Sequence, residues 1–123
     1  MSEQVNTADG QDEIQHMDYI YMVNDNKLII RMNAELDHHL AEEMRQVIDD
    51  VIDKRGVTHI VFDFTKVDFM DSAGIGLLIG RYKLAKMLGG VAEITNTSKS
   101  IEKVLEMSGI TRIIPIIQNS KVS

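Results

Sequence analysis

The fold is decided around the stretch Asp68-Phe69-Met70-Asp71-Ser72-Ala73-Gly74-Ile75-Gly76. The hydrophobic run 60–64 comes before it, and apolar residues at helical spacing follow it to about Leu88. The stretch therefore predicts a strand, a short loop and a helix that starts at Ser72 or Ala73. Glycines 74, 76 and 80 fall in the first half of that helix, and each costs about 1 kcal/mol relative to alanine. Glycines so unfavourable to a helix indicate that another backbone or a partner protein comes close there, because a face without side chains leaves room for it.

Ser72 stands at the expected start of this helix, and it has two interpretations. Its hydroxyl can cap the helix by accepting a hydrogen bond from a free amide of the first turn. The same free amides and the helix dipole favour a phosphate, so Ser72 can also be a regulatory phosphorylation site. The position alone favours the cap.

The first half of the chain predicts a hairpin followed by a helix. Residues 19–23 and 28–32 read as strands, and the turn-forming run Asn24-Asp25-Asn26 lies between them. Asp37 can cap the next helix, and Gly56 can end it. The charged face of that helix is most simply a solvated face.

The second half alternates strand and helix. Residues 91–95 predict a strand, and Ser98 and Gly109 mark the start and the end of a short helix. The run 113–117 predicts a last strand, which must lie at a sheet edge because Pro115 has no amide to donate. The order β-β-α-β-α-β-α-β predicts an α/β fold with right-handed crossovers and a largely parallel sheet.

Two segments together resemble the STAS domain of bacterial anti-sigma factor antagonists. Residues 71–76 resemble the family's Asp-Ser-Ser/Thr/Ala-Gly-Leu/Ile-Gly segment, in which the serine after the aspartate is phosphorylated. Glu35-Leu36-Asp37-His38-His39 resembles the family's strand-to-helix loop, most closely in the sporulation type that antagonises the anti-sigma F factor. The resemblance covers about residues 19–117, and further matches are Gly80-Arg81-Tyr82-Lys83, Gly89-Gly90 and Met107-Ser108-Gly109.

The resemblance implies a STAS fold, with a small mixed sheet of four to five strands and helices packed mainly on one side. It implies a regulatory protein of the cytoplasm rather than an enzyme, with no cofactor. The unphosphorylated form would bind an anti-sigma factor that is also a serine kinase, phosphorylation of Ser72 would end the binding, and a serine phosphatase would restore it. The resemblance also implies that the 35–39 loop lies beside the serine loop and helps to form the partner surface. The implied partner-binding residues are Glu35, Asp37, His38, Asp71, Ser72, Ala73, Gly74 and Gly76.

Length and composition fit one small domain. We expect residues 1–17 to be a flexible acidic tail, residues 18–118 the STAS domain and residues 119–123 a polar tail without the helix that relatives usually carry after the last strand. The 123 residues carry a formal charge of −6 and no cysteine. An acidic domain without a basic patch argues against nucleic-acid binding. No apolar run reaches the roughly 18 residues of a membrane span. We expect the free protein to be a monomer.

Other chemistries fit the sequence less well. The adjacent His38 and His39 do not converge as metal ligands do, and Asp63 and Asp68 lack a third carboxylate at a coherent spacing. We therefore expect no metal site. The glycines of 74–80 imitate a dinucleotide fingerprint, but the last glycine is one residue late and the motif lies within the helix.

Three alternative functions remain open. A STAS subunit of a different stress-signalling complex would keep the same surface and change the partner. A weak nucleotide-binding module would show itself in equilibrium dialysis with GTP and ATP. A serine hydrolase would need a base oriented toward Ser72, and the chain lacks the Gly-x-Ser-x-Gly elbow.

Overall fold

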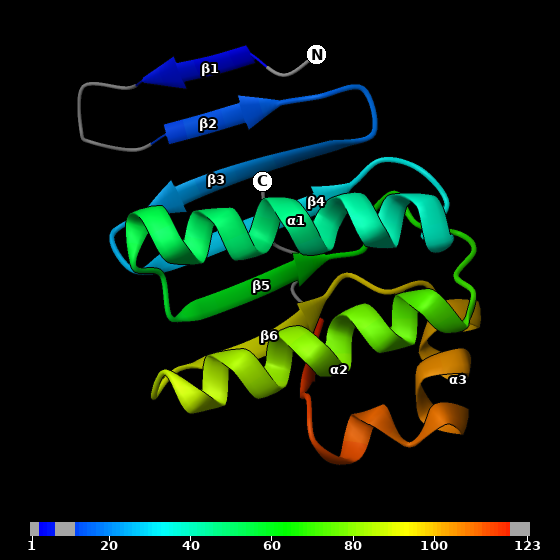
Figure 1. The fold of residues 1–123 in the computed structure, drawn as a ribbon. Helices are drawn as coiled ribbons and strands as arrows, with labels where there is room; N and C mark the ends of the chain where they lie inside the picture. The colour runs from blue at the N-terminus through cyan, green and yellow to red at the C-terminus, as the bar shows by residue number, and fades with distance from the viewer. Residues whose placement is uncertain (1–2, 7–11, 119–123) are drawn as a thin grey trace.

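The computed structural model describes residues 3–6 and 12–118, which form one mixed sheet with helices (Figure 1). The sheet has seven strands in sequential order. In chain order the elements are β1 (Glu3–Asn6), β2 (Asp12–Gln15), β3 (Tyr19–Asn24), β4 (Lys27–Met32), α1 (His38–Arg55), β5 (His59–Asp63), α2 (Ser72–Met87), β6 (Val91–Thr95), α3 (Lys99–Ser108), the 3₁₀ turn η1 (Ile110–Arg112) and β7 (Ile116–Ile117).

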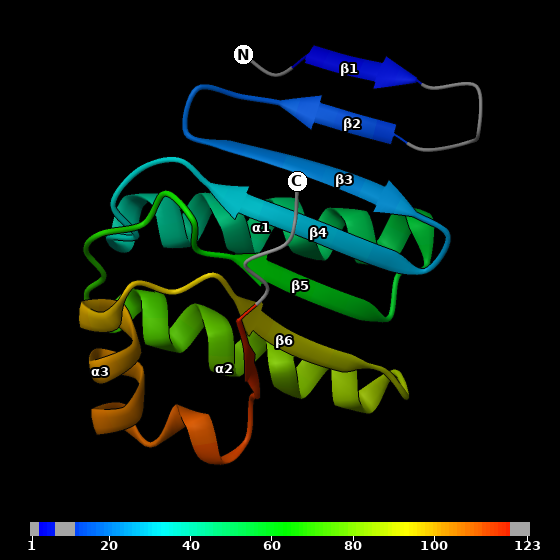
Figure 2. The ribbon, with the colours of Figure 1, turned by 180° about the vertical axis from the view of Figure 1, so that it is seen from behind.

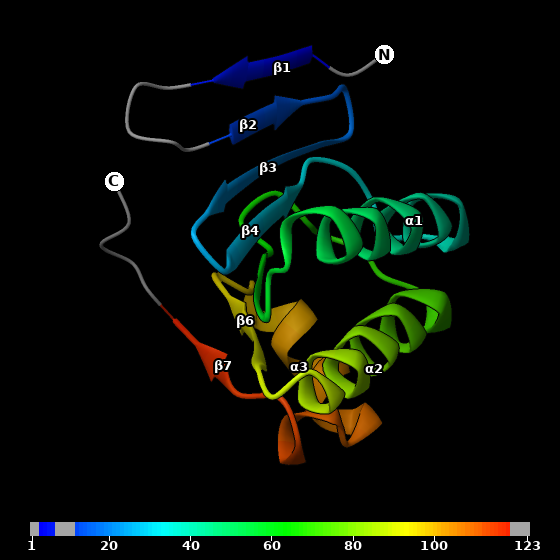
Figure 3. The same cartoon turned by 60° about the vertical axis from the view of Figure 1, so that its left-hand side comes forward.

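The order predicted from residue 19 onward is confirmed, including the hairpin of β3 and β4. The strands β1 to β4 pair antiparallel, whereas β4, β5, β6 and β7 run parallel. Helices α1 and α2 lie side by side on one face of the sheet, and α3 lies beyond the end of that layer (Figures 2 and 3). This is the predicted one-sided α/β arrangement, with more strands than the expected four to five.

The core lies between the sheet and the helix pair. Leu28, Ile30 and Met32 alternate along β4 and are fully buried, and Ile60 and Phe62 of β5 continue the same layer. Helix α1 packs its apolar stripe against this layer through Leu40, Ala41, Met44, Ile48 and Val51. The continuous apolar run of β5 reflects its place in the middle of the parallel part of the sheet.

The flexible acidic tail expected over residues 1–17 contains two segments of regular structure. Residues 3–6 and 12–15 are strands, and β2 pairs with the outer edge of β3. Backbone N–H and C=O groups form the hydrogen bonds between β2 and β3, so the residues of β2 need little alternation of apolar and polar side chains. Without β2, the edge of β3 would present unpaired backbone donors and acceptors. The remaining tail residues, 1–2 and 7–11, and the expected tail 119–123 lie outside the described residues.

The last strand is shorter than the predicted 113–117. Ile113 and Ile114 both donate backbone hydrogen bonds to the carbonyl of Ile110, at 3.0 and 2.9 Å, which closes a 3₁₀ turn instead of a ladder. Only Ile116 and Ile117 pair with β6. The predicted edge position of this strand is confirmed, because β7 is the last strand in the sheet order.

The helices are capped largely as predicted. Asp37 caps α1 through Leu40 N at 3.0 Å, and Ser98 caps α3 through Ile101 N at 3.2 Å. Gly56 and Gly109 both adopt the left-handed conformation at helix C-termini. Among the residues that the structure describes, no helix is both long and apolar enough to cross a membrane.

Candidate functional site

The two loops that carry the sequence motifs are joined by backbone hydrogen bonds. Leu36 N donates to the carbonyl of Phe69 at 2.9 Å, and Asp71 N donates to the carbonyl of Leu36 at 3.3 Å. Leu36 and Met70 form an isolated parallel bridge, and both side chains are buried. The N-termini of α1 and α2 therefore lie next to each other, as the resemblance implies.

Asp71 is the N-cap of α2, a position that the sequence left to Ser72. Its Oδ1 accepts from Ala73 N at 2.8 Å and from Gly74 N at 3.4 Å. Its Oδ2 accepts from His38 N, in the first turn of α1, at 3.1 Å. A helix start leaves its first amides without intrahelical partners, and one carboxylate here satisfies amides of two helices.

Ser72 is the first residue of α2 and is exposed, so the prediction that it can cap the helix is wrong. Aspartate and serine are comparable N-caps, and the chain places the aspartate one residue earlier. Within the described part of the chain, no hydrogen bond to the Ser72 hydroxyl is found. The hydroxyl is thus open to solvent at the positive end of a helix dipole.

The glycines of α2 have different surroundings. Gly74 is buried, and a Cβ there would lie 2.4 Å from Cγ of Met70 and 3.1 Å from Cδ2 of Leu36. Gly74 therefore allows the two loops to pack closely, and because it is buried it is not open to a partner. At Gly76 and Gly80 an added Cβ would meet nothing within 4 Å.

A groove runs between α1 and α2 beside Ser72, and we call it the α1–α2 groove. It is lined by His38, Ala41, Glu42, Arg45, Ala73, Gly76, Leu77 and Arg81. At the Ser72 end its walls are the small residues Ala41, Ala73 and Gly76, which leave room for a partner's side chain or backbone. Three of the eight predicted partner-binding residues line this groove: His38, Ala73 and Gly76.

Glu35 and Asp37 lie around a separate hollow at the start of α1. That hollow is lined by Asp18, Ala34, Glu35, Asp37, His39, Leu40 and Glu43. The hydrogen bond from Leu40 N lowers the pKa of the Asp37 carboxyl, so this cap is ionised at neutral pH. Five of the eight predicted residues therefore divide between the α1–α2 groove and this second hollow, and Asp71, Ser72 and Gly74 line neither.

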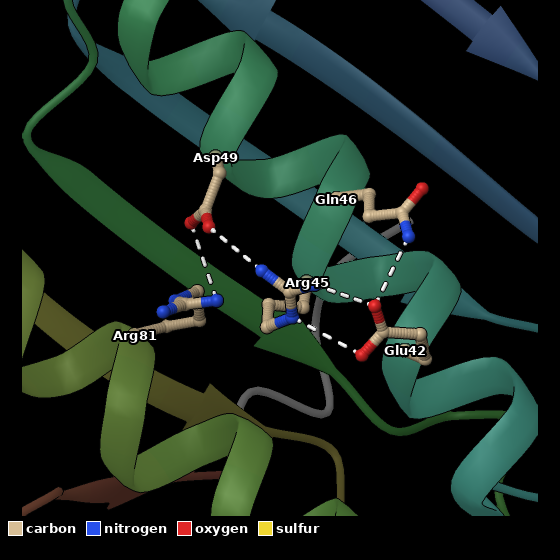
Figure 4. A network of polar contacts seen from close by, with 5 residues as sticks. All are labelled: Glu42, Arg45, Gln46, Asp49 and Arg81. Carbon is tan, nitrogen blue, oxygen red and sulfur yellow. Dashed lines mark hydrogen bonds and ion pairs between the residues drawn. The ribbon is translucent and has the colours of Figure 1, made fainter.

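A charged network that includes the groove residues Glu42, Arg45 and Arg81 joins α1 to α2 (Figure 4). Arg81 from α2 reaches across to Asp49 of α1 at 3.2 Å, and its side chain is only 13% exposed. Arg45 lies 3.6 Å from the other oxygen of Asp49 and also pairs with Glu42. Hydrogen bonds from Arg45, then from Gln46, lower the pKa of Glu42 to about 2.

Sequence reasoning missed this groove as a unit. The charged face of α1, which includes Glu42 and Arg45, predicts only a solvated surface, and Arg81 enters the sequence argument only through the family resemblance. The ion pair between Arg81 and Asp49 joins residues 32 positions apart, and no local periodicity reveals such a contact. The local signal that points to this face is the run of glycines in the first half of α2, of which Gly76 lines the groove.

Among the described residues, no group of three or more His, Asp or Glu side chains is placed to hold a metal ion. The rings of His38 and His39 face each other with centroids 4.1 Å apart. Because α2 begins at Ser72, the glycines of 74–80 lie inside the helix rather than in a phosphate-binding turn before it.

Comparisons with known proteins agree with this geometry. The family model described as STAS domain matches residues 19–122. An anti-sigma F factor antagonist of Paenibacillus polymyxa is 39% identical over 92 residues, which are 75% of this chain and 79% of that protein. The anti-sigma factor antagonist SpoIIAA in its unphosphorylated form matches with a TM-score of 0.73 and 33% identity, over 81% of this chain and 85% of that one.

The same relative has also been solved in another state. The structure of the Bacillus cell fate determinant SpoIIAA in the phosphorylated form matches with a TM-score of 0.66 and 33% identity, covering 81% of this chain and 88% of that one. Both forms of that protein therefore share the fold described here.

Proposed function

Because the chain belongs to the STAS domain family, we propose that it is an anti-sigma factor antagonist controlled by phosphorylation of Ser72. In the unphosphorylated state it binds an anti-sigma factor that is also a serine kinase, and so releases a sigma factor. The kinase activity of that partner modifies Ser72 and ends the binding, and a serine phosphatase reverses the change. The protein acts as a regulatory binding protein of the cytoplasm, not as an enzyme. The names of its relatives support the antagonist role.

The observation that carries the proposal is the position of the Ser72 hydroxyl. The hydroxyl is exposed, and it is not needed as the helix cap because Asp71 fills that role. It also adjoins the α1–α2 groove, which is lined by the next residue, Ala73. A kinase can reach it without unfolding the helix. A partner that fills the groove lies next to this residue, so a phosphate on Ser72 stands at the binding surface.

The charge change is large enough to switch binding. A phosphate on Ser72 adds about −1.5 to −2 charge and three acceptor oxygens. It would stand beside the Asp71 carboxylate, and a partner surface shaped for a neutral hydroxyl and an open glycine would meet repulsion and a desolvation cost. A loss of about 3 kcal/mol weakens binding more than about a hundredfold.

Substitutions at Ser72 test the switch against a matched control. We expect Ser72→Ala to bind the anti-sigma factor of the same organism normally and to resist phosphorylation, and Ser72→Asp to bind poorly. Ser98→Asp adds the same charge at the start of α3 and keeps a good capping residue there. It should bind like the unmodified chain.

Two results would contradict the proposal. One is equal affinity of the Ser72→Ala and Ser72→Asp variants for the anti-sigma factor. The other is a phosphopeptide map, after kinase treatment, that finds the phosphate elsewhere in the chain. Ala73 removes one ambiguity from this map, because Ser72 is the only hydroxyl residue of the segment 68–76.

A further inference from the structure

Asp71 joins the two helix N-termini through a single carboxylate. On the α2 side its Oδ1 takes the amides of Ala73 and Gly74, at 2.8 and 3.4 Å. On the α1 side its Oδ2 takes the amide of His38, at 3.1 Å. The two oxygens therefore serve different helices, and any change that displaces the carboxylate acts on both.

The first turn of α1 depends on this bond for one particular amide. Asp37 caps α1 by accepting from Leu40 N at 3.0 Å. His38 N donates to Asp71 Oδ2, at 3.1 Å. His38 is also a wall of the α1–α2 groove, so the bond from Asp71 fixes one edge of the groove.

A phosphate on Ser72 would compete with Asp71 directly. The two residues are neighbours in the chain, and the amides of Ala73 and Gly74, which now donate to Asp71 Oδ1, belong to the same helix start that would receive a phosphate. A phosphoserine has more charge and more acceptor oxygens than a carboxylate, and the two anions repel each other. Both effects push the Asp71 carboxylate away from its present position.

We propose that Asp71 is a positioning residue that transmits phosphorylation of Ser72 to the first turn of α1, by releasing the amide of His38. The inference rests on the proposed function only in taking Ser72 as the modified residue. It adds a second component to the switch. The phosphate repels the partner, and the groove edge at His38 also loses its anchor.

Amide hydrogen exchange measured by NMR tests the coupling within one molecule. The samples are the unmodified chain and the full chain with phosphoserine installed at position 72 by amber suppression, so no kinase is needed. Phosphorylation should speed exchange of the His38 amide by about tenfold, the effect of losing one charge-assisted hydrogen bond. The Leu40 amide, held by Asp37, is the internal control and should change by less than about twofold. Unchanged His38 exchange would overturn the proposal.

The variant Asp71→Asn separates coupling from a general loss of structure. An asparagine has one acceptor oxygen, so it can serve the amides of α2 or the amide of His38 but not both sets. If its oxygen keeps the α2 cap, the His38 amide exchanges fast already without phosphate, and phosphoserine at position 72 adds no further change. A His38 amide that responds to phosphorylation equally with Asp71 and with asparagine would refute transmission through this carboxylate.

Failure of this coupling and failure of the proposed function give different experimental results. If phosphoserine at position 72 leaves anti-sigma factor binding unchanged but frees the His38 amide, the antagonist switch fails and the coupling stands. If binding falls while the His38 amide stays protected, the switch acts by charge at Ser72 alone and the coupling fails.

Discussion

Ser72 and Ser98 occupy similar places in the sequence and opposite roles in the structure. Each stands at the start of a helix, and the sequence allows each to cap it. Ser98 does so, accepting from Ile101 N at 3.2 Å. Ser72 does not, because Asp71 takes the amides of the first turn and leaves the hydroxyl exposed.

The difference shows what makes a serine available for regulation. A capping hydroxyl is engaged in the fold, and modifying it would cost helix stability. Where a neighbouring aspartate already caps the helix, the hydroxyl has no structural task and can change its charge while the helix persists. In the proposed switch the pair Asp71-Ser72 divides stability and signalling between adjacent residues, whereas at Ser98 one residue carries the structural role alone.

The largest expected stability effect lies at Asp71. Replacement by alanine removes the cap of α2, worth about 0.5–2 kcal/mol, and the bond to His38 N, worth about 1 kcal/mol more. We expect Asp71→Ala to lower the free energy of unfolding by about 1.5–3 kcal/mol, measured by urea denaturation. A loss below that of the Ser98→Ala variant would contradict the two-helix role.

The two serines themselves give the next test. Ser98→Ala should destabilise the protein by about 1 kcal/mol, because the amide of Ile101 loses its partner. Ser72→Ala should leave the free energy of unfolding within about 0.5 kcal/mol of that of the unmodified chain, since the Ser72 hydroxyl is exposed and does not cap the helix. Equal losses in the two variants, by the same denaturation measurement, would erase the contrast between the residues.

The open glycines of α2 extend the comparison to the groove. Gly76→Ala and Gly80→Ala meet no steric obstacle, so each should stabilise the protein by up to about 1 kcal/mol through helix propensity. Gly76 lines the α1–α2 groove and Gly80 does not. Calorimetric titration should therefore show weaker anti-sigma factor binding for Gly76→Ala and unchanged binding for Gly80→Ala. Equal affinities would remove the groove from the partner surface.

The smallest effect is the pH dependence of the Glu42 contact. Its pKa falls from 4.5 to about 2 in the folded protein, so its stabilising contribution is present above 4.5 and is lost as the pH falls toward 2. The contact is solvent-exposed and screened, so the effect should be slight. The stability difference between the unmodified chain and Glu42→Gln should shrink from neutral pH to acid. A difference that stays constant over that range would contradict the assigned pKa.

Much of the fold was predictable because local signals agreed with the final packing. The caps Asp37 and Ser98, the stops Gly56 and Gly109 and the hairpin turn at 24–26 are all where the sequence places them. The strands at 3–6 and 12–15 were missed because backbone pairing to β3 holds them without a clear side-chain pattern.

The candidate site was predictable only in outline. The motif residues predicted a serine loop beside the 35–39 loop, and the structure joins the two. The choice of Asp71 over Ser72 as the cap depends on which oxygen the folded loop presents to the amides. The α1–α2 groove depends on the contact of Arg81 with Asp49 across two helices. Neither is encoded in a local period or spacing, so sequence reasoning could not find them.

The most direct test of the central claim is a calorimetric titration of the anti-sigma factor from the same organism, at fixed salt. It is titrated into the unmodified chain and into the chain with phosphoserine at position 72. We predict a Kd at least about a hundredfold higher for the phosphorylated chain, equivalent to about 3 kcal/mol. The same Kd for both chains would contradict the account.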